Sequence, residues 1–263
     1  MSELRGAGVL VTGASGGLGH AIARSLAGEG ARLVLSGRRR EVLEALSSEL
    51  GGETMVADLC RDKDVDRLSA RAAQLDVVVA NAALPASGRL EDFLPEEIDR
   101  ALAVNLRVPM VLARAVLPSW VARGHGHLVF ISSLAGKVAT PGSAVYSATK
   151  FGLRGFAAAL RADLYGSGIG VATVLPGFVS DAGMFADSGA TLPPGLGTVT
   201  PEAVGKAVVH AIRSGRAEVE VAPGLLRLGV FLGTLAPGAS AAVTGRLGRR
   251  LARQVASGQR EKH

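Results

Sequence analysis

Short runs of apolar residues alternate along the chain with longer stretches in which apolar residues recur at helical spacing. The short runs predict strands, and they are nearly continuous in apolar residues rather than alternating. This is typical of strands that are buried on both faces, as in a parallel sheet. Seven strands are predicted, at Val9–Val11, Arg32–Leu35, Thr54–Ala57, Leu75–Val79, His127–Ile131, Gly170–Leu175 and Glu218–Ala222.

The stretches between these strands predict helices with one apolar side. Pro95–Val121 reads as one long helix, which Pro109 should kink or break. The late segment Ala182–Thr200 is rich in Gly, Pro, Ser and Thr, and it is either a substrate lid or a surface loop. The other predicted helices are Leu18–Leu26, one that carries Val42, Leu43, Leu46 and Leu50, Asp64–Gln74, Tyr146–Tyr165 and Glu202–Ile212.

Regular alternation of strand and helix predicts an α/β fold in a single domain. We expect a doubly wound, Rossmann-like parallel sheet of about seven strands with helices on both faces. The length of 263 residues fits one such domain. We assign residues 1–224 to this domain and residues 225–263 to a helical, basic C-terminal extension.

Composition changes this picture in two places. Cys60 is the single cysteine, so no internal disulfide can form, and the N-terminus lacks an apolar signal core. A cytoplasmic location is therefore expected.

Much of the net charge of +6 lies in the last residues. A solvated helical face is favoured there over nucleic-acid binding, and peripheral membrane contact is kept as an alternative. These residues are Arg246, Arg249, Arg250, Arg253, Arg260 and Lys262.

A glycine-rich turn follows the first predicted strand, with the sequence Thr12-Gly13-Ala14-Ser15-Gly16-Gly17-Leu18-Gly19. Glycines between a strand and a helix let backbone N–H groups approach a pyrophosphate at the helix N-terminus. The turn also matches the G-x-S-x-G pattern of hydrolases. That elbow normally follows several strands, and no acid and histidine pair supports it here, so dinucleotide binding is favoured.

The second strand is followed by Arg38, Arg39 and Arg40. Enzymes that use NAD place an acidic residue here for the ribose 2′-hydroxyl, whereas a 2′-phosphate is bound by cations. The absence of a carboxylate therefore favours NADP over NAD.

Tyr146 and Lys150 lie four positions apart at the start of a predicted helix, on one face. A nearby ammonium is expected to lower the pKa of the phenol and to make it a usable acid or base. Ser133 follows the fifth strand, at the edge where parallel sheets bind ligands, and can donate to a substrate oxygen. His125 and His127 lack a further ligand, so no metal site is expected.

These residues together resemble the short-chain dehydrogenase/reductase family. The resemblance covers Leu4 to about Ala222, and the order and spacing of its motifs are specific. The matching residues are Thr12-Gly13-x-x-x-Gly17-x-Gly19, Asp58, Asn105, Ser133, Tyr146-x-x-x-Lys150 and Pro176-Gly177.

The resemblance implies a set of roles. Tyr146 would exchange the proton on the substrate oxygen, Lys150 would hold the nicotinamide ribose, Ser133 would orient the carbonyl, and Asn105 would place a water in a proton relay. It also implies a homodimer or homotetramer built through the two long helices. The cofactor would be NADP(H), contacted by Gly13, Ser15, Gly17, Leu18, Gly19, Arg38, Asp58, Leu59, Asn81, Ala82, Tyr146, Lys150, Pro176, Gly177 and Val179.

Two positions depart from the family pattern. Ala80-Asn81-Ala82-Ala83 stands where the family has N-N-A-G, and Asp181 stands where the family often has Thr. Neither departure touches the residues of proton transfer. We therefore predict an oxidoreductase that moves a hydride between NADP(H) and a carbonyl or alcohol of a small, apolar molecule. The alternative is a protein without turnover that binds NADP in a regulatory role or associates with a membrane surface.

Overall fold

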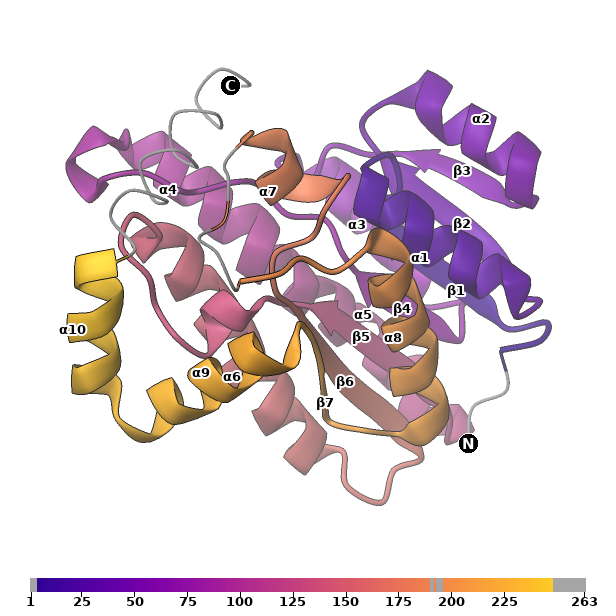
Figure 1. Cartoon of the computed structure of the whole chain (residues 1–263). Helices are drawn as coiled ribbons and strands as arrows, with labels where there is room; N and C mark the ends of the chain where they lie inside the picture. The colour runs from indigo at the N-terminus through magenta and orange to yellow at the C-terminus, as the bar shows by residue number, and fades with distance from the viewer. Residues whose placement is uncertain (1–3, 190–191, 193–195, 248–263) are drawn as a thin grey trace.

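The computed structural model describes residues 4–189, 192 and 196–247. A single parallel sheet crosses the molecule, with helices on both of its faces (Figure 1). Its seven strands lie in the order β3-β2-β1-β4-β5-β6-β7, which confirms the predicted doubly wound fold. The strands are β1 Gly8–Thr12, β2 Arg32–Gly37, β3 Glu53–Val56, β4 Val77–Ala80, β5 Gly126–Ile131, β6 Ile169–Pro176 and β7 Glu218–Val221.

The helices fall between these strands as the apolar periodicity predicts. The main ones are α1 Gly17–Gly28, α2 Arg40–Leu50, α3 Asp62–Ala72, α4 Pro95–Leu102, α5 Val108–Arg123, α6 Ala144–Asp163 and α8 Pro201–Ser214. Shorter turns are η1 Leu90–Asp92, η2 Ala103–Arg107, η3 Leu134–Gly136 and α7 Gly183–Asp187. Two helices, α9 Gly224–Leu235 and α10 Pro237–Leu247, follow the last strand. The division of the chain at residue 225 stays a prediction.

Successive residues of the central strands enter two different cores. Val9 and Val11 of β1 pack with Ile22 of α1 and Val208 of α8 on one face. Leu10 packs on the other face, in the core that also contains Leu112 of α5. Because both faces of the central strands are covered, these strands need apolar residues at nearly every position, whereas the edge strands β3 and β7 are partly exposed and carry polar residues.

The long helix predicted over residues 95–121 is interrupted by the π-helical turn η2. Pro109 lies in the first turn of α5 and has no N–H to donate to the carbonyl of Asn105, four residues earlier. The break predicted at Pro109 is thus present, just before the proline. Such π turns often occur at functional sites.

The helical stretch Pro95–Arg123 is long and apolar enough, by length and composition, to span a membrane. In this fold its apolar residues Val108, Leu112 and Val116 are buried in the core beside the sheet. Trp120 is fully buried as well, and its Nε1 donates to the carbonyl of Leu75 at 2.8 Å. The stretch is therefore accounted for as a core helix.

The segment 182–200 is only partly a loop. It contains α7, and Val199 pairs with Val179 in an isolated parallel bridge. Backbone N–H groups of Ser180 and Val199 donate to Val199 and Phe178, both at 2.9 Å. Residues 190–191 and 193–195 lie outside the described residues, and the lid stays a prediction.

Candidate active site

Most of the predicted site residues follow the carboxyl ends of strands and so lie along one edge of the sheet, whereas Asn105 lies in η2 and Tyr146 and Lys150 lie on α6. Strand order reverses between β1 and β4, so the connection that leaves β1 and the connection that leaves β4 run in opposite directions. Ligands of open α/β sheets bind at such a point, where the diverging connections leave a crevice.

The glycine turn after β1 has a backbone that side chains would obstruct. Gly13 has φ +66°, and a Cβ there would meet Cα of Ala82 at 2.8 Å. A Cβ on Gly19 would lie 2.2 Å from the carbonyl oxygen of Gly13. The close packing of this turn on the start of α1 therefore requires glycine at both positions.

Thr12 and Asn81 hold this turn against β4. The amide of Asn81 donates to the carbonyls of Thr12 and Gly13 at 3.0 and 3.3 Å. Thr12 Oγ1 accepts from the backbone N–H groups of Asn81 and Ala82 at 3.0 and 3.1 Å. The sequence did not predict this role of Thr12, although the position of Thr12 at the end of the first strand could have indicated a contact with the neighbouring strand.

The arginine run after β2 is exposed beside the glycine turn. Arg39 donates through Nη2 to the carbonyl of Ser15. A Cβ on Gly37 would lie 2.5 Å from Oγ of Ser15, so the end of β2 and the turn are in close contact. The sequence suggested Arg38 as the cation of this corner, and the structure adds Arg39.

Asp58 lies in the turn after β3 and shapes that turn. Its Oδ1 accepts from the backbone N–H of Cys60 at 3.1 Å, and its own N–H donates to Asp64 at 2.9 Å. Leu59 packs against the core beside α3 and α5, just as Leu18 packs on the opposite core.

Ser133, Tyr146 and Lys150 come together from two elements. Ser133 lies just beyond β5 and caps η3, where its Oγ accepts from the N–H of Ala135 at 3.1 Å. The Ser133 side chain lies close enough to Tyr146 to lower the pKa of its phenol. Lys150 is buried one helical turn further along α6, with Nζ 5.6 Å from the centre of the Tyr146 ring and 2.9 Å from the carbonyl oxygen of Ile131.

The pKa of Tyr146 differs from our expectation. Burial raises this pKa to about 12, and the hydrogen bond with Ser133 lowers it only in part. Burial also lowers the pKa of Lys150 to about 8, because a low-dielectric surrounding disfavours the ammonium. The prediction that Lys150 brings the Tyr146 pKa down toward neutrality is wrong for this structure, because burial raises this pKa and Ser133, not Lys150, is the group that lowers it.

Asn105 lies in the π turn η2 and is buried. Its Oδ1 accepts from the N–H of Leu84 at 2.7 Å, and its Nδ2 donates to the carbonyl of Leu84 at 2.9 Å. A longer contact of 3.4 Å reaches Thr149, the neighbour of Lys150 in the chain. Asn105 therefore ties the segment after β4 to α6, and its part in a proton relay stays a prediction.

Pro176 and Gly177 end β6 beside this group. Ser133 Oγ lies 3.4 Å from the carbonyl oxygen of Pro176. A Cβ on Gly177 would contact Leu226 at 3.2 Å and Leu134 at 3.4 Å, so apolar side chains border this point. Asp181, which departs from the family pattern, has φ +58° and forms a bend before α7.

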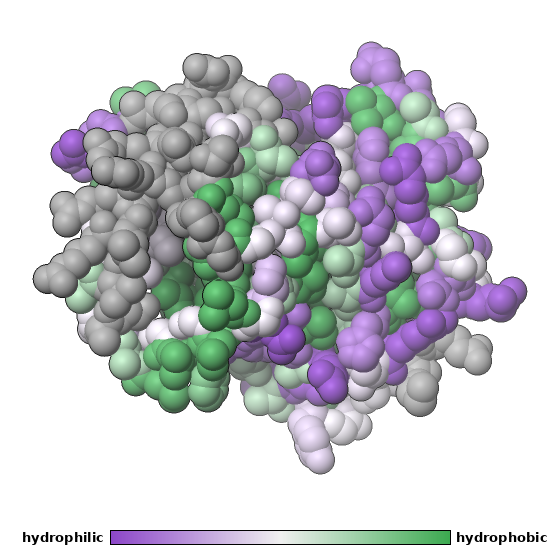
Figure 2. All heavy atoms as spheres, in the orientation of Figure 1, coloured by the Kyte–Doolittle hydropathy of each residue, from purple (hydrophilic) through white to green (hydrophobic). Residues whose placement is uncertain are grey.

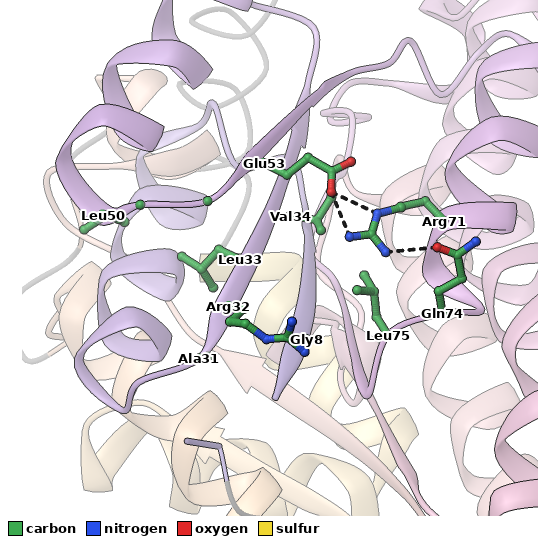
Figure 3. A pocket seen from close by; sticks show the side chains of 12 residues that line it. Gly8, Ala31, Arg32, Leu33, Val34, Leu50, Glu53, Arg71, Gln74 and Leu75 are labelled. Atoms are coloured by element: carbon green, nitrogen blue, oxygen red, sulfur yellow. Dashed lines mark hydrogen bonds and ion pairs between the residues drawn. The ribbon is translucent and has the colours of Figure 1, made fainter. Parts of the chain in front are cut away.

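A pocket of about 530 Å³ lies at the opposite edge of the sheet (Figure 3). Its wall includes Gly8, Arg32 and Glu53, which begin β1, β2 and β3. Arg71 closes one side by an ion pair with Glu53 at 2.8 Å. None of the predicted site residues lines this pocket.

Comparisons with known proteins agree with this geometry. Residues 7–192 match the short chain dehydrogenase family. The chain belongs to the short-chain dehydrogenase/reductase family. It is therefore an oxidoreductase that acts with NAD(P)(H).

Two curated relatives match this chain over most of its length. A ketoacyl reductase, HetN, from Nostoc sp. is 36% identical over 251 residues, which cover 90% of this chain and 88% of the relative. Dehydrogenase/reductase SDR family member 7B from Bos taurus is 31% identical and covers 89% of this chain and 79% of its own length.

Solved structures of similar fold include complexes with the phosphorylated cofactor. A short-chain dehydrogenase from Sphingobium yanoikuyae in complex with NADPH has a TM-score of 0.75 at 29% identity, over 81% of this chain and 87% of its own. A metagenomic short-chain oxidoreductase in complex with NADP has a TM-score of 0.68 at 33% identity, over 84% of this chain and 99% of its own.

Proposed function

We propose that this family member reduces a carbonyl group of an apolar small molecule with NADPH. The observation that carries the proposal is the group of Ser133, Tyr146 and buried Lys150 at the carboxyl edge of the sheet. A phenol and a hydroxyl that lie close together can both turn toward one substrate oxygen. The glycine turn after β1 provides the fitting cradle for a dinucleotide beside it.

The preference for NADPH rests on the corner formed by the glycine turn and the end of β2. Arg38 and Arg39 follow β2, no carboxylate stands there, and Arg39 already contacts the turn at Ser15. A guanidinium can grip a 2′-phosphate with two parallel hydrogen bonds. The complexes of the structural neighbours with NADP(H) support the same preference.

The residues present fit a bound nicotinamide dinucleotide, whose pyrophosphate would lie on the glycine turn and whose ring would border Pro176 and Gly177. When bound, the cofactor supplies the hydride. Tyr146 gives a proton to the substrate oxygen, and Ser133 donates a hydrogen bond to the same oxygen as negative charge develops there. Lys150, which is charged below its pKa of about 8, stabilises the phenolate that forms when Tyr146 gives up its proton.

The raised pKa of Tyr146 favours reduction over oxidation. With a pKa of about 12 the phenol keeps its proton throughout the neutral range. An alkoxide formed from a carbonyl is a stronger base than a phenolate, so this proton moves readily to the substrate. Oxidation of an alcohol would instead need Tyr146 ionised at the outset.

The proposed substrate is apolar because Leu134 and Leu226 border the site at Gly177. The name of the Nostoc relative adds ketoacyl compounds as a class to be tried. A cytoplasmic location and a homodimer or homotetramer also stay predictions.

A spectrophotometric screen tests this function. NADPH and NADH oxidation are followed with ketones, aldehydes, quinones and ketoacyl thioesters of increasing chain length. We expect turnover with NADPH and at least one carbonyl, and a rising kcat/KM as the apolar part grows. Tight NADPH binding without turnover on any compound would favour the regulatory alternative.

A further inference from the structure

The helix α9 exposes a continuous apolar side. Five of the eleven large hydrophobic side chains exposed in the described part of the chain lie on this one helix of 12 residues. Four of them repeat at spacings of three and four, which places them in one stripe. Figure 2 shows hydrophobic residues gathered where Figure 1 draws α9. We call the set the outer face of α9, formed by Leu225, Leu228, Phe231, Leu232 and Leu235, which are 54–68% exposed.

The opposite side of α9 fixes this orientation. Val230 is buried and packs with Leu226 against Leu134 and Leu175. At the start of the helix, Arg227 pairs with Glu220 of β7 at 3.3 Å. The inner side therefore packs on the fold, and the outer face is exposed within the part of the chain that the structure describes.

Further ion pairs connect this contact with the candidate site. Glu220 also pairs with Lys137 at 2.7 Å, and Lys137 pairs with Glu218 at 2.8 Å. Lys137 directly follows η3, the turn that Ser133 caps. Because Leu226 also borders Gly177, the outer face lies on the other side of a helix that walls the candidate site.

The net positive charge of the chain is concentrated in the part of the sequence that begins with α9. Seven of the 29 Lys and Arg residues but one of the 23 Asp and Glu residues lie in 225–263. This segment therefore carries the whole formal charge of +6, and residues 1–224 carry none. From Glu220 to Glu261 no acidic residue intervenes.

We propose that the outer face of α9 docks on an anionic lipid surface. An apolar helix face in a segment whose sequence is rich in cations is the combination that binds at the interface of a membrane with negative headgroups. A second copy of the chain fits less well, because pairing two outer faces would bring two segments of like charge together. The proposal concerns binding in the plane of the interface, not a spanning helix, since α9 is too short to cross a bilayer.

Vesicle sedimentation with the full chain tests this proposal without any need for turnover. Vesicles of phosphatidylcholine are compared with vesicles that contain about one third phosphatidylglycerol. The variant Leu228→Ser/Leu232→Ser removes two side chains of the outer face. The matched control, Leu90→Ser/Leu94→Ser, removes two equally exposed leucines near α4. Circular dichroism and NADPH affinity establish that each variant is folded.

The full chain should sediment with the anionic vesicles, and high salt should weaken its binding several-fold. The α9 variant should lose about tenfold or more in partition coefficient, from the apolar area removed, and the control should change less than about twofold. No sedimentation, or equal loss in both variants, would overturn the proposal.

Two further outcomes would also count against it. Equal binding to neutral vesicles would refute the anionic partner. A native dimer that the α9 variant alone converts to a monomer, without vesicle binding, would assign the outer face to a second copy. NADPH turnover on a water-soluble carbonyl should be the same for the full chain and both variants, so failure here is separate from failure of the proposed function.

Discussion

The two halves of the candidate site are built in different ways. On the β1–β4 side, glycines and backbone hydrogen bonds fix the turn, and Thr12 and Asn81 hold it in place. On the β5–β6 side, Tyr146 and Lys150 on α6 meet Ser133 beyond β5. The first half depends on the backbone conformation that glycine allows, and the second half depends on the functional groups of particular side chains. Binding of the nucleotide and turnover should therefore be separable by substitution.

The largest separation is expected for Tyr146→Phe. This change removes the proton donor and leaves the ring, so turnover should fall by about a thousandfold, within the usual range for general acids. The dissociation constant for NADPH should change less than about twofold. Steady-state kinetics beside a fluorescence titration of NADPH measure both. A comparable loss in both quantities would show that the two halves are not independent.

The reverse separation is expected for Gly19→Ala. The added Cβ would lie 2.2 Å from the carbonyl oxygen of Gly13, so the backbone of the turn must shift. NADPH affinity should fall by about a hundredfold, as expected when several backbone hydrogen bonds to an anion are misplaced. The control is Gly28→Ala in the same helix, where a Cβ meets nothing within 4 Å. Unchanged NADPH affinity in Gly19→Ala would contradict our account of the turn.

Cofactor choice should depend on Arg38 and Arg39, which follow β2. Replacement of Arg38 and Arg39 by Ser should raise the KM for NADPH by about tenfold to a hundredfold, the value of one or two charge-assisted hydrogen bonds. The KM for NADH should change little. Arg40→Ser is the control, because Arg40 pairs with Glu44 on the outside of α2 at 3.6 Å. An equal effect on both cofactors would remove the case for a 2′-phosphate site.

The pH dependence tests the proton-transfer half. Lys150 has a lowered pKa of about 8, so its charge is present below pH 8 and lost above it. Tyr146, with a raised pKa of about 12, keeps its proton across this range. The kcat/KM for reduction should be level up to about pH 8 and then fall by up to tenfold per unit. A rise through pH 8–9 would mean that an ionised Tyr146 is the active form.

Sequence alone predicted the seven strands, the parallel doubly wound sheet and the edge at which the site residues gather. These follow from apolar runs and from residues placed directly after strands, both of which are local signals. The pKa of Tyr146 was predicted to be lowered and is raised instead. The spacing to Lys150 is visible in the sequence, whereas the burial of the phenol is not. The role of Arg39 could not be separated from that of Arg38, since the contact with Ser15 is made across the fold.

The π turn at Asn105 shows a second limit. Pro109 predicts a break, but the form of the break depends on the hydrogen bonds of Asn105 with Leu84, which is distant in the sequence. Likewise, the apolar residues of α9 predict a buried helix as readily as an exposed one. Only the packing of Leu226 and Val230 shows which side faces outward.

The central claim is that a hydride passes from NADPH to a carbonyl carbon while Tyr146 protonates the oxygen. The most direct measurement uses NADPH deuterated at C4 of the nicotinamide with the best carbonyl substrate, followed by mass spectrometry of the product. We predict an alcohol with one deuterium on carbon, and no such product from Tyr146→Phe. NADPH oxidation that leaves the carbonyl compound unlabelled would contradict the account.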